Sequence, residues 1–198
     1  MNHNKPIEIV DNIFFIGAFD PDIRTFDIIM KTANGSSYNA YLIKTEEGVI
    51  IVDTVKLEYQ NEFFAKIEEL CSYDEIKYVI SHHLEPDHAG AIPELIKRAS
   101  QAKVLISTQA TPMLKAITDK DDIDFESVWT NKTLTLGSKT IKFLTTPYLH
   151  CPETMSSYVV EDRLLFSGDV FGSHYYDKRL FDDLVGDFSY SFKYYYST

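Results

Sequence analysis

The sequence has little of what marks secreted, membrane-spanning or disulfide-rich proteins. Its two cysteines, Cys71 and Cys151, are too few for a disulfide framework. No apolar run approaches the roughly 18–20 residues that a membrane helix requires, and the first residues lack the apolar core of a signal peptide. These absences predict a cytoplasmic protein without a membrane segment, in which thiols stay reduced.

Positive charge is also scarce. The 198 residues include 19 Lys and Arg against 30 Asp and Glu, which gives a formal net charge of −11 at pH 7. Nucleic acids and anionic membranes attract proteins that carry clustered positive charge, so neither is an expected partner. The hydrophobic content of 44% is typical of a globular chain with a buried core.

The spacing of apolar residues predicts strands, then mixed strands and helices, then strands again. The expected strands cover residues 7–10, 13–16, 26–31, 38–43, 48–53, 76–81, 102–108, 133–136, 140–145, 157–160 and 164–167. The expected helices cover residues 63–70, 89–99 and 111–117, where helical spacing appears. This order favours an α/β sandwich of three or four layers, with β-sheets inside and helices outside.

The C-terminal segment 187–198 is dense in aromatic side chains. Its pattern is that of a helix that begins with an apolar face but has no stop signal. We therefore expect residues 1–198 to form one domain that is incomplete at its C-terminus.

The segment 81–90, SHHLEPDHAG, carries the strongest chemical signal. It follows a buried strand, where layered α/β folds place ligand sites, and it holds five ionisable side chains: His82, His83, Glu85, Asp87 and His88. Imidazoles and carboxylates together suit iron, zinc or manganese. The alternative is a solvated turn in which Asp87 caps the next helix, but three of the six histidines in one turn favour a metal site. Neither cysteine is expected to add a thiolate ligand.

Three further residues are candidates because each follows an apolar strand. His150 lies between two prolines and would otherwise be an ordinary surface histidine. Asp169 lies next to Gly168, and its two oxygens suit a bridge between two cations, although a turn or cap is the alternative. Asp53 is expected to orient a ligand histidine or to cap a turn.

These motifs, in this order, resemble the metallo-β-lactamase superfamily. Most members carry H-x-H-x-D-H, whereas this chain has Glu85 in place of the second histidine. That change, with the following Pro-Asp-His-Ala-Gly, resembles the flavodiiron proteins, also called A-type flavoproteins. The segments 37–43 and 147–155 look similar to the same family. The resemblance implies a metallo-β-lactamase-like αββα sandwich, with mixed β-sheets flanked by helices.

The resemblance also implies a ligand set for two irons. His83, Glu85 and His150 would hold one iron, Asp87 and His88 the other, and Asp169 would bridge them. The family has a further histidine that nothing here matches, because His174 follows Asp169 too closely. His82 has no assigned role.

The family resemblance implies an oxidoreductase that reduces dioxygen to water, nitric oxide to nitrous oxide, or both. Electrons would come from FMN in a flavodoxin-like domain, which this chain lacks, across a homodimer. A rubredoxin-type protein or a flavin reductase would be the electron donor. The expected aromatic walls of the site are Phe19, Phe26 and Tyr148.

The ligand chemistry separately favours iron. A carboxylate at position 85 adds negative charge and stabilises ferric iron, whereas a hydrolase needs a strongly Lewis-acidic zinc. The alternative functions are a zinc-dependent hydrolase of the same superfamily and an inactive metal-binding fragment.

Overall fold

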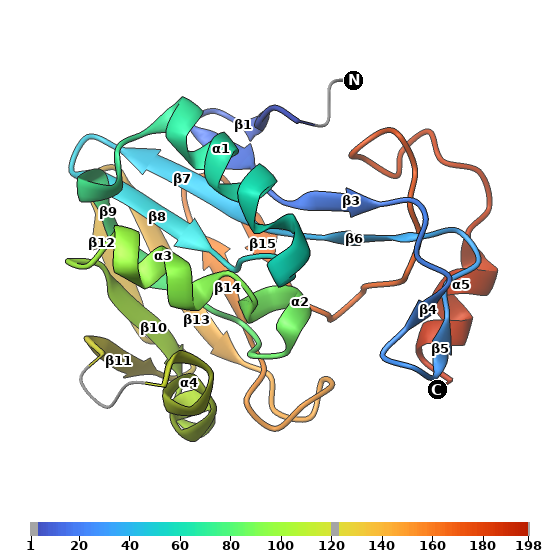
Figure 1. Ribbon diagram of the computed structural model, residues 1–198. Coiled ribbons are helices and arrows are strands. Elements are labelled where there is room, and N and C mark those ends of the chain that lie inside the picture. Colours follow the sequence, from blue (N-terminus) through green and yellow to red (C-terminus); the bar gives the residue numbers. More distant parts are fainter. Residues whose placement is uncertain (1–3, 120–122, 198) are drawn as a thin grey trace.

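The computed structural model describes residues 4–119 and 123–197 (Figure 1). Two β-sheets stack face to face, and helices lie against the larger sheet. The larger sheet comprises, in spatial order, β1 (Ile7–Val10), β2 (Ile13–Phe15), β7 (Tyr41–Thr45), β8 (Gly48–Val52), β9 (Ile76–Ile80), β10 (Lys103–Ser107) and β11 (Phe125–Val128). The smaller sheet comprises β12 (Thr133–Leu136), β13 (Lys139–Thr145), β14 (Met155–Val159) and β15 (Leu164–Phe166).

Two short hairpin-like sheets and several helices complete the fold. The short sheets pair β3 (Ala18–Asp20) with β6 (Ser36–Tyr38), and β4 (Thr25–Phe26) with β5 (Met30–Lys31). The α-helices are α1 (Gln60–Leu70), α2 (Pro86–Ala89), α3 (Ile92–Arg98), α4 (Thr111–Thr118) and α5 (Ser189–Tyr195). Short 3-10 helices cover Leu57–Tyr59, Tyr73–Glu75 and Thr108–Ala110. No helix in the described ranges is both long and apolar enough to cross a membrane.

Strand β8, at the centre of the larger sheet, is apolar because both of its faces are buried. Val49 and Ile51 pack in the core beneath the helices, whereas Ile50 and Val52 pack in the core between the two sheets. Side chains alternate between the two faces of a strand, so a strand covered on both faces needs apolar residues throughout. The predicted sandwich with internal sheets is therefore confirmed.

The strand directions bring several chain segments to one edge of the larger sheet. β8, β9, β10 and β11 run parallel to one another, so their carboxyl ends meet there. Backbone hydrogen bonds continue beyond the strand ends into the loops. The N–H of Asp53 donates to Ile80 O at 2.8 Å, and the N–H of Met155 donates to His82 O at 3.0 Å. The second bond ties the smaller sheet to the loop that follows β9.

Several predicted elements differ in detail from the structure. The expected strand 26–31 is wrong, because the chain reverses between β4 and β5 with positive φ at Asp27 and Ile28. The expected helix 89–99 corresponds to α3, which is shorter and begins at Ile92, while Ala89 is the last residue of the separate helix α2. Pro93 lies in the first turn of α3, where proline is tolerated. The expected strand 38–43 is divided between β6 and β7. β3 and β11 were not predicted, and α5 lies in the predicted C-terminal helical segment.

Gly90, at the end of α2, generates a prediction because backbone atoms surround it. A Cβ at this position would lie 2.7 Å from Leu57 N and Pro86 O and 2.8 Å from Val55 O. We expect Gly90→Ala to lower the free energy of unfolding by about 1–3 kcal/mol, as overpacking does, in urea denaturation. Gly186→Ala is the matched control, since nothing lies within 4 Å of its Cβ. Equal stability of the two variants would contradict the close packing.

Candidate metal centre

Three loops at one edge of the sandwich supply the candidate ligands. The loop after β9 leads through His83 and Glu85 into α2, which carries Asp87 and His88. His150 lies in the loop between β13 and β14, and Asp169 follows β15. The structure brings all six predicted ligand residues together, although they span 87 positions from His83 to Asp169 when both ends are counted.

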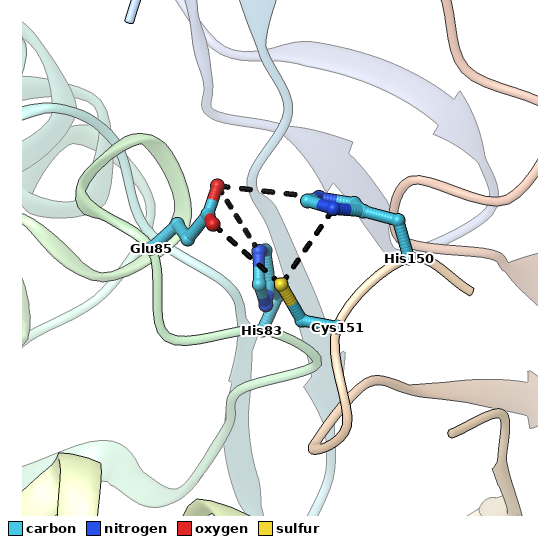
Figure 2. Close-up of side chains that lie close together, drawn as sticks. All are labelled: His83, Glu85, His150 and Cys151. Atoms are coloured by element: carbon cyan, nitrogen blue, oxygen red, sulfur yellow. Dashed lines mark hydrogen bonds and ion pairs between the residues drawn. The ribbon is translucent and has the colours of Figure 1, made fainter. Parts of the chain in front are cut away.

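His83, Glu85 and His150 form a first cluster (Figure 2). Glu85 Oε2 lies 3.4 Å from His83 Nε2 and 4.0 Å from His150 Nε2. Cys151 belongs to the same group, because one donor atom from each of the four side chains lies within 4.8 Å of the others. Glu85 reaches this position from the residue just before α2, where its backbone is still extended.

Asp87 and His88 form a second cluster. His88 Nε2 lies 3.5 Å from Asp87 Oδ2, and α2 holds both residues against the core. The backbone carbonyl of His88 accepts hydrogen bonds from the backbone N–H and the hydroxyl of Thr54, at 2.8 and 2.7 Å. These contacts fix the short helix to the chain that follows β8.

Asp169 connects the two clusters through different oxygens. Its Oδ1 lies 2.9 Å from His88 Nε2, whereas its Oδ2 lies 3.2 Å from His150 Nε2 and 3.9 Å from His83 Nε2. A carboxylate with one oxygen facing each cluster has the form needed to bridge two cations.

Unpaired polar atoms test whether these residues fit metal ions. His83 Nε2 and Asp87 Oδ1 are buried and have no hydrogen-bond partner of normal geometry in the described ranges. Buried polar groups in native proteins are nearly always paired, because an unpaired one loses its hydration. Cations bound between the clusters would satisfy both atoms, so the donor set fits a two-metal centre.

The electrostatics of the site also favour positive charge. Burial acts to lower the pKa of His88, but negative Asp169 and Asp87 outweigh it and raise that pKa well above its usual value. A hydrogen bond to Asp169 raises the pKa of His150. Burial, followed by the charge of Asp169, raises the pKa of Asp87. The neighbouring carboxylates thus favour the protonated, positively charged forms of His88 and His150. Divalent cations bound at the site would balance the same negative charge.

Comparison with known proteins agrees with this geometry. The family profile described as "ODP family beta lactamase" matches residues 37–196. A Type A flavoprotein from Rhodobacter capsulatus is 48% identical, with 96% of this chain and 44% of that protein covered. Flavo-diiron protein FprA2 from Clostridium acetobutylicum is 42% identical, with 96% and 48% covered. The chain belongs to the flavodiiron protein family, as its metallo-β-lactamase-like domain.

Two further matches bear on what flavodiiron proteins do. A protein from Moorella thermoacetica named nitric oxide reductase is 36% identical, with 92% of this chain and 46% of that protein covered. The structure of rubredoxin oxygen:oxidoreductase from Desulfovibrio gigas superposes with a TM-score of 0.89 at 31% identity, covering 96% of this chain and 48% of that one. The chain spans about half the length of the curated relatives described here. The predicted fold family is therefore confirmed.

Two buried residues, Asp53 and His82, lie behind the clusters. Asp53 accepts hydrogen bonds from the backbone N–H of His82 at 2.7 Å and from its Nδ1 at 2.8 Å, and it lies 3.7 Å from His88 Nδ1. His82 Nε2 is hydrogen-bonded to Ser157 Oγ at 2.8 Å. His82 thus lies between Asp53 and the smaller sheet, and its buried ring links the loop after β9 to β14.

Glu153 is a positioning residue that the sequence did not reveal. It is 3% exposed, and its Oε1 accepts a hydrogen bond of 2.6 Å from His83 Nδ1. This contact leaves Nε2 of His83 facing the cluster. The only sequence signal was its place in the Pro-Glu-Thr segment just after His150.

A cavity of about 620 Å³ opens over both clusters. Phe26 and Tyr148 line it as predicted, whereas Phe19 does not, because its ring packs against Phe15 at a centroid separation of 5.3 Å. His174 also lines the cavity, but its Nδ1 is hydrogen-bonded to Ser36 Oγ at 2.8 Å rather than to either cluster.

The prediction that neither cysteine is placed to add a thiolate is wrong for Cys151. Its Sγ lies 3.6 Å from Glu85 Oε1. The sequence offered no sign of this contact, because residues 85 and 151 belong to loops that meet only in the folded chain. Cys71 follows α1 and lies elsewhere, as expected.

Glu153→Gln tests whether this buried carboxylate positions His83. Removing the charged acceptor behind a ligand histidine lowers metal affinity by about 10–100-fold. We expect that loss for ferrous iron in anaerobic competition titrations against a chromophoric chelator. Exposed Glu58→Gln is the matched control and should bind as the parent does. Unchanged affinity in Glu153→Gln would show that the contact does not organise the site.

Proposed function

We propose that this chain is the di-iron part of an enzyme that reduces dioxygen to water, nitric oxide to nitrous oxide, or both. The observation that carries the proposal is Asp169, whose two oxygens face two separate donor clusters. The names of the Desulfovibrio and Moorella relatives, an oxygen oxidoreductase and a nitric oxide reductase, support the choice of substrates.

The proposed ligands divide between two iron positions. His83, Glu85 and His150 would hold the first iron, and Asp87 with His88 the second, while Asp169 would contact both. Iron bound there would supply electrons through its ferrous and ferric states and open positions for a diatomic substrate. The protein fixes the ligand directions in advance, chiefly through Glu153 behind His83 and α2 beneath His88.

The cavity walls fit small, uncharged substrates. Phe26 and Tyr148 present aromatic surface at the cavity wall, and the cavity has room for a diatomic molecule beside the clusters. Tyr195 also lines the cavity, and burial, followed by the negative charge of Asp169, raises the pKa of its hydroxyl. That hydroxyl therefore keeps its proton at neutral pH. Both proposed reductions consume protons, and an O–H at the cavity wall can donate a hydrogen bond toward the reacting molecule.

Parts outside this chain would complete the enzyme. The chain covers under half of the Type A flavoprotein, so FMN, a homodimeric arrangement and a rubredoxin-type or flavin reductase donor are proposed for the whole protein. Without FMN to renew the electrons, we expect these residues alone to complete at most one two-electron reduction of nitric oxide rather than many. We propose the cytoplasm as its compartment, in keeping with its two free thiols.

Stoichiometric reaction with nitric oxide tests the proposal. Anaerobic loading with ferrous iron should give close to two irons per chain, and two ferrous ions supply the two electrons that convert two nitric oxide molecules to one nitrous oxide and water. Gas chromatography should detect up to one nitrous oxide per chain, and the chain loaded with zinc should yield none. Reduction of dioxygen to water takes four electrons, so the same sample should consume one dioxygen per two chains as its iron is oxidised, without releasing hydrogen peroxide. A chain that binds two irons but reacts with neither gas would refute the proposal.

Glu85→His tests the preference for iron over zinc. Replacing the anionic oxygen donor by a neutral imidazole lowers the negative charge at the first position, which favours zinc. We expect the variant to bind a larger share of zinc than the parent when both proteins are equilibrated anaerobically with equal ferrous iron and zinc, measured by elemental analysis. Exposed Glu58→His is the control for an added histidine. Identical metal ratios in variant and parent would remove the ligand argument for iron.

A further inference from the structure

A buried chain of hydrogen bonds runs behind the second cluster, from a carboxylate through an imidazole to a hydroxyl. His82 Nδ1 is hydrogen-bonded to Asp53 Oδ2 at 2.8 Å, and His82 Nε2 is hydrogen-bonded to Ser157 Oγ at 2.8 Å. The backbone N–H of His82 also donates to Asp53 Oδ1 at 2.7 Å. All three side chains are buried. Each oxygen of Asp53 is therefore held by a hydrogen bond from His82.

The order of these groups is that of a Ser-His-Asp triad, but burial excludes a nucleophilic role. The attacking oxygen of such a triad must reach a substrate, whereas Ser157 is 0% exposed. It lies within β14, which pairs with β13 on one side and β15 on the other. We therefore looked for a different group on which the hydrogen-bonded chain could act.

That group is the ring of His88. Its Nδ1 lies 3.7 Å from Asp53 Oδ2 and has no hydrogen-bond partner of normal geometry among the residues that the structure describes. Its Nε2 faces the carboxylates of Asp87 and Asp169. Proteins commonly orient a ligand histidine through a carboxylate on its other ring nitrogen. Hydrogen bonds of this kind measure about 2.7–3.2 Å, so a shift of about 0.5–1 Å would complete one to Asp53.

His82 determines how Asp53 faces His88. A carboxylate only accepts hydrogen bonds, so Nδ1 of His82 donates to Asp53. The hydroxyl of Ser157 can donate or accept, and it holds the other side of the His82 ring in either protonation state. With both donors of His82 in place, the Asp53 carboxylate has a fixed orientation, in which Oδ2 also faces His88 Nδ1.

We propose that His82 is a positioning residue for the second metal position: it orients Asp53, which in turn orients His88 toward the metal. His82 binds no metal itself. This inference rests on the proposed two-metal site, but not on its redox chemistry. Because Ser157 belongs to the smaller sheet, the chain of hydrogen bonds also makes the second position depend on the contact between the two sheets.

Two substitutions at His82 separate positioning from packing. The amide nitrogen of Asn occupies about the place of Nδ1 in histidine, whereas that of Gln occupies about the place of Nε2. His82→Asn therefore keeps a donor to Asp53, and His82→Gln keeps only a polar atom toward Ser157. Ferrous iron affinity is measured anaerobically by competition with a chromophoric chelator, for each of the two equivalents.

We expect His82→Gln to weaken the binding of one equivalent of ferrous iron by about 10–100-fold, the range for loss of a residue behind a metal ligand. His82→Asn should retain the affinity of the parent. A role in packing alone would give the opposite order, since Gln is the larger side chain and fills more of the buried space.

A double variant identifies the affected position. Glu153→Gln acts behind His83 at the first position. If His82 acts on the second position, combining His82→Gln with Glu153→Gln should weaken both equivalents. Ser157→Ala removes only a hydroxyl and should weaken the same equivalent as His82→Gln, which keeps the proposal testable if His82→Gln does not fold.

The outcomes separate this inference from the di-iron proposal. Parent affinity at both equivalents in His82→Gln, equal losses at both, or equal losses in the Gln and Asn variants would overturn the positioning role and leave the di-iron proposal standing. One equivalent at parent affinity in the double variant would overturn the assignment to the second position. If His82→Gln does not fold, unchanged affinity in Ser157→Ala would overturn the inference. A parent chain that binds fewer than two irons would contradict both proposals.

Discussion

The site depends on a single electrostatic constraint: several carboxylates and imidazoles lie together at the buried edge of a sandwich, and positive charge must balance them. Asp169 is central to this balance, because its oxygens contact both clusters at 2.9 and 3.2 Å. The positive charge of His88, with hydrogen bonds from His150 and His88, outweighs burial and keeps the pKa of Asp169 far below its usual range. The carboxylate therefore stays negative and available to cations.

The fold meets this constraint by delivering each ligand from a rigid strand end. The parallel strands β8 and β9 place Asp53 and the motif loop side by side, and hydrogen bonds between Asp53 and His82 join them. The smaller sheet contributes the loops that hold His150 and Asp169 from the opposite side. His83 to His88 follow directly on β9, and Asp169 lies three residues after β15, so the strand ends restrict where these side chains lie and limit the entropy that metal binding would otherwise cost.

The sequence alone pointed to the six candidate ligands that the structure brings together, because they occur in motifs that follow apolar strands. The alternation of His83, Glu85 and Asp87 is visible without a structure, and so is the strand before Asp169. Glu153 and Cys151 were missed because their roles arise from long-range contacts, 70 and 66 positions along the chain from His83 and Glu85 respectively. Apolar periodicity says nothing about the conformation of the loop that carries them. The same limit explains the hairpin of β4 and β5, where positive φ at Asp27 and Ile28 reverses a segment that reads as one strand.

We propose above all that Asp169 holds two metal ions side by side. X-ray absorption spectroscopy of the anaerobically iron-loaded chain measures this most directly, because a second iron scatters strongly at the separation of about 3.5–4 Å that is typical of two-metal sites. We expect an iron–iron contribution at that separation in the parent chain, and its loss in Asp169→Asn. Two bound irons without any iron–iron contribution in the parent would contradict the claim.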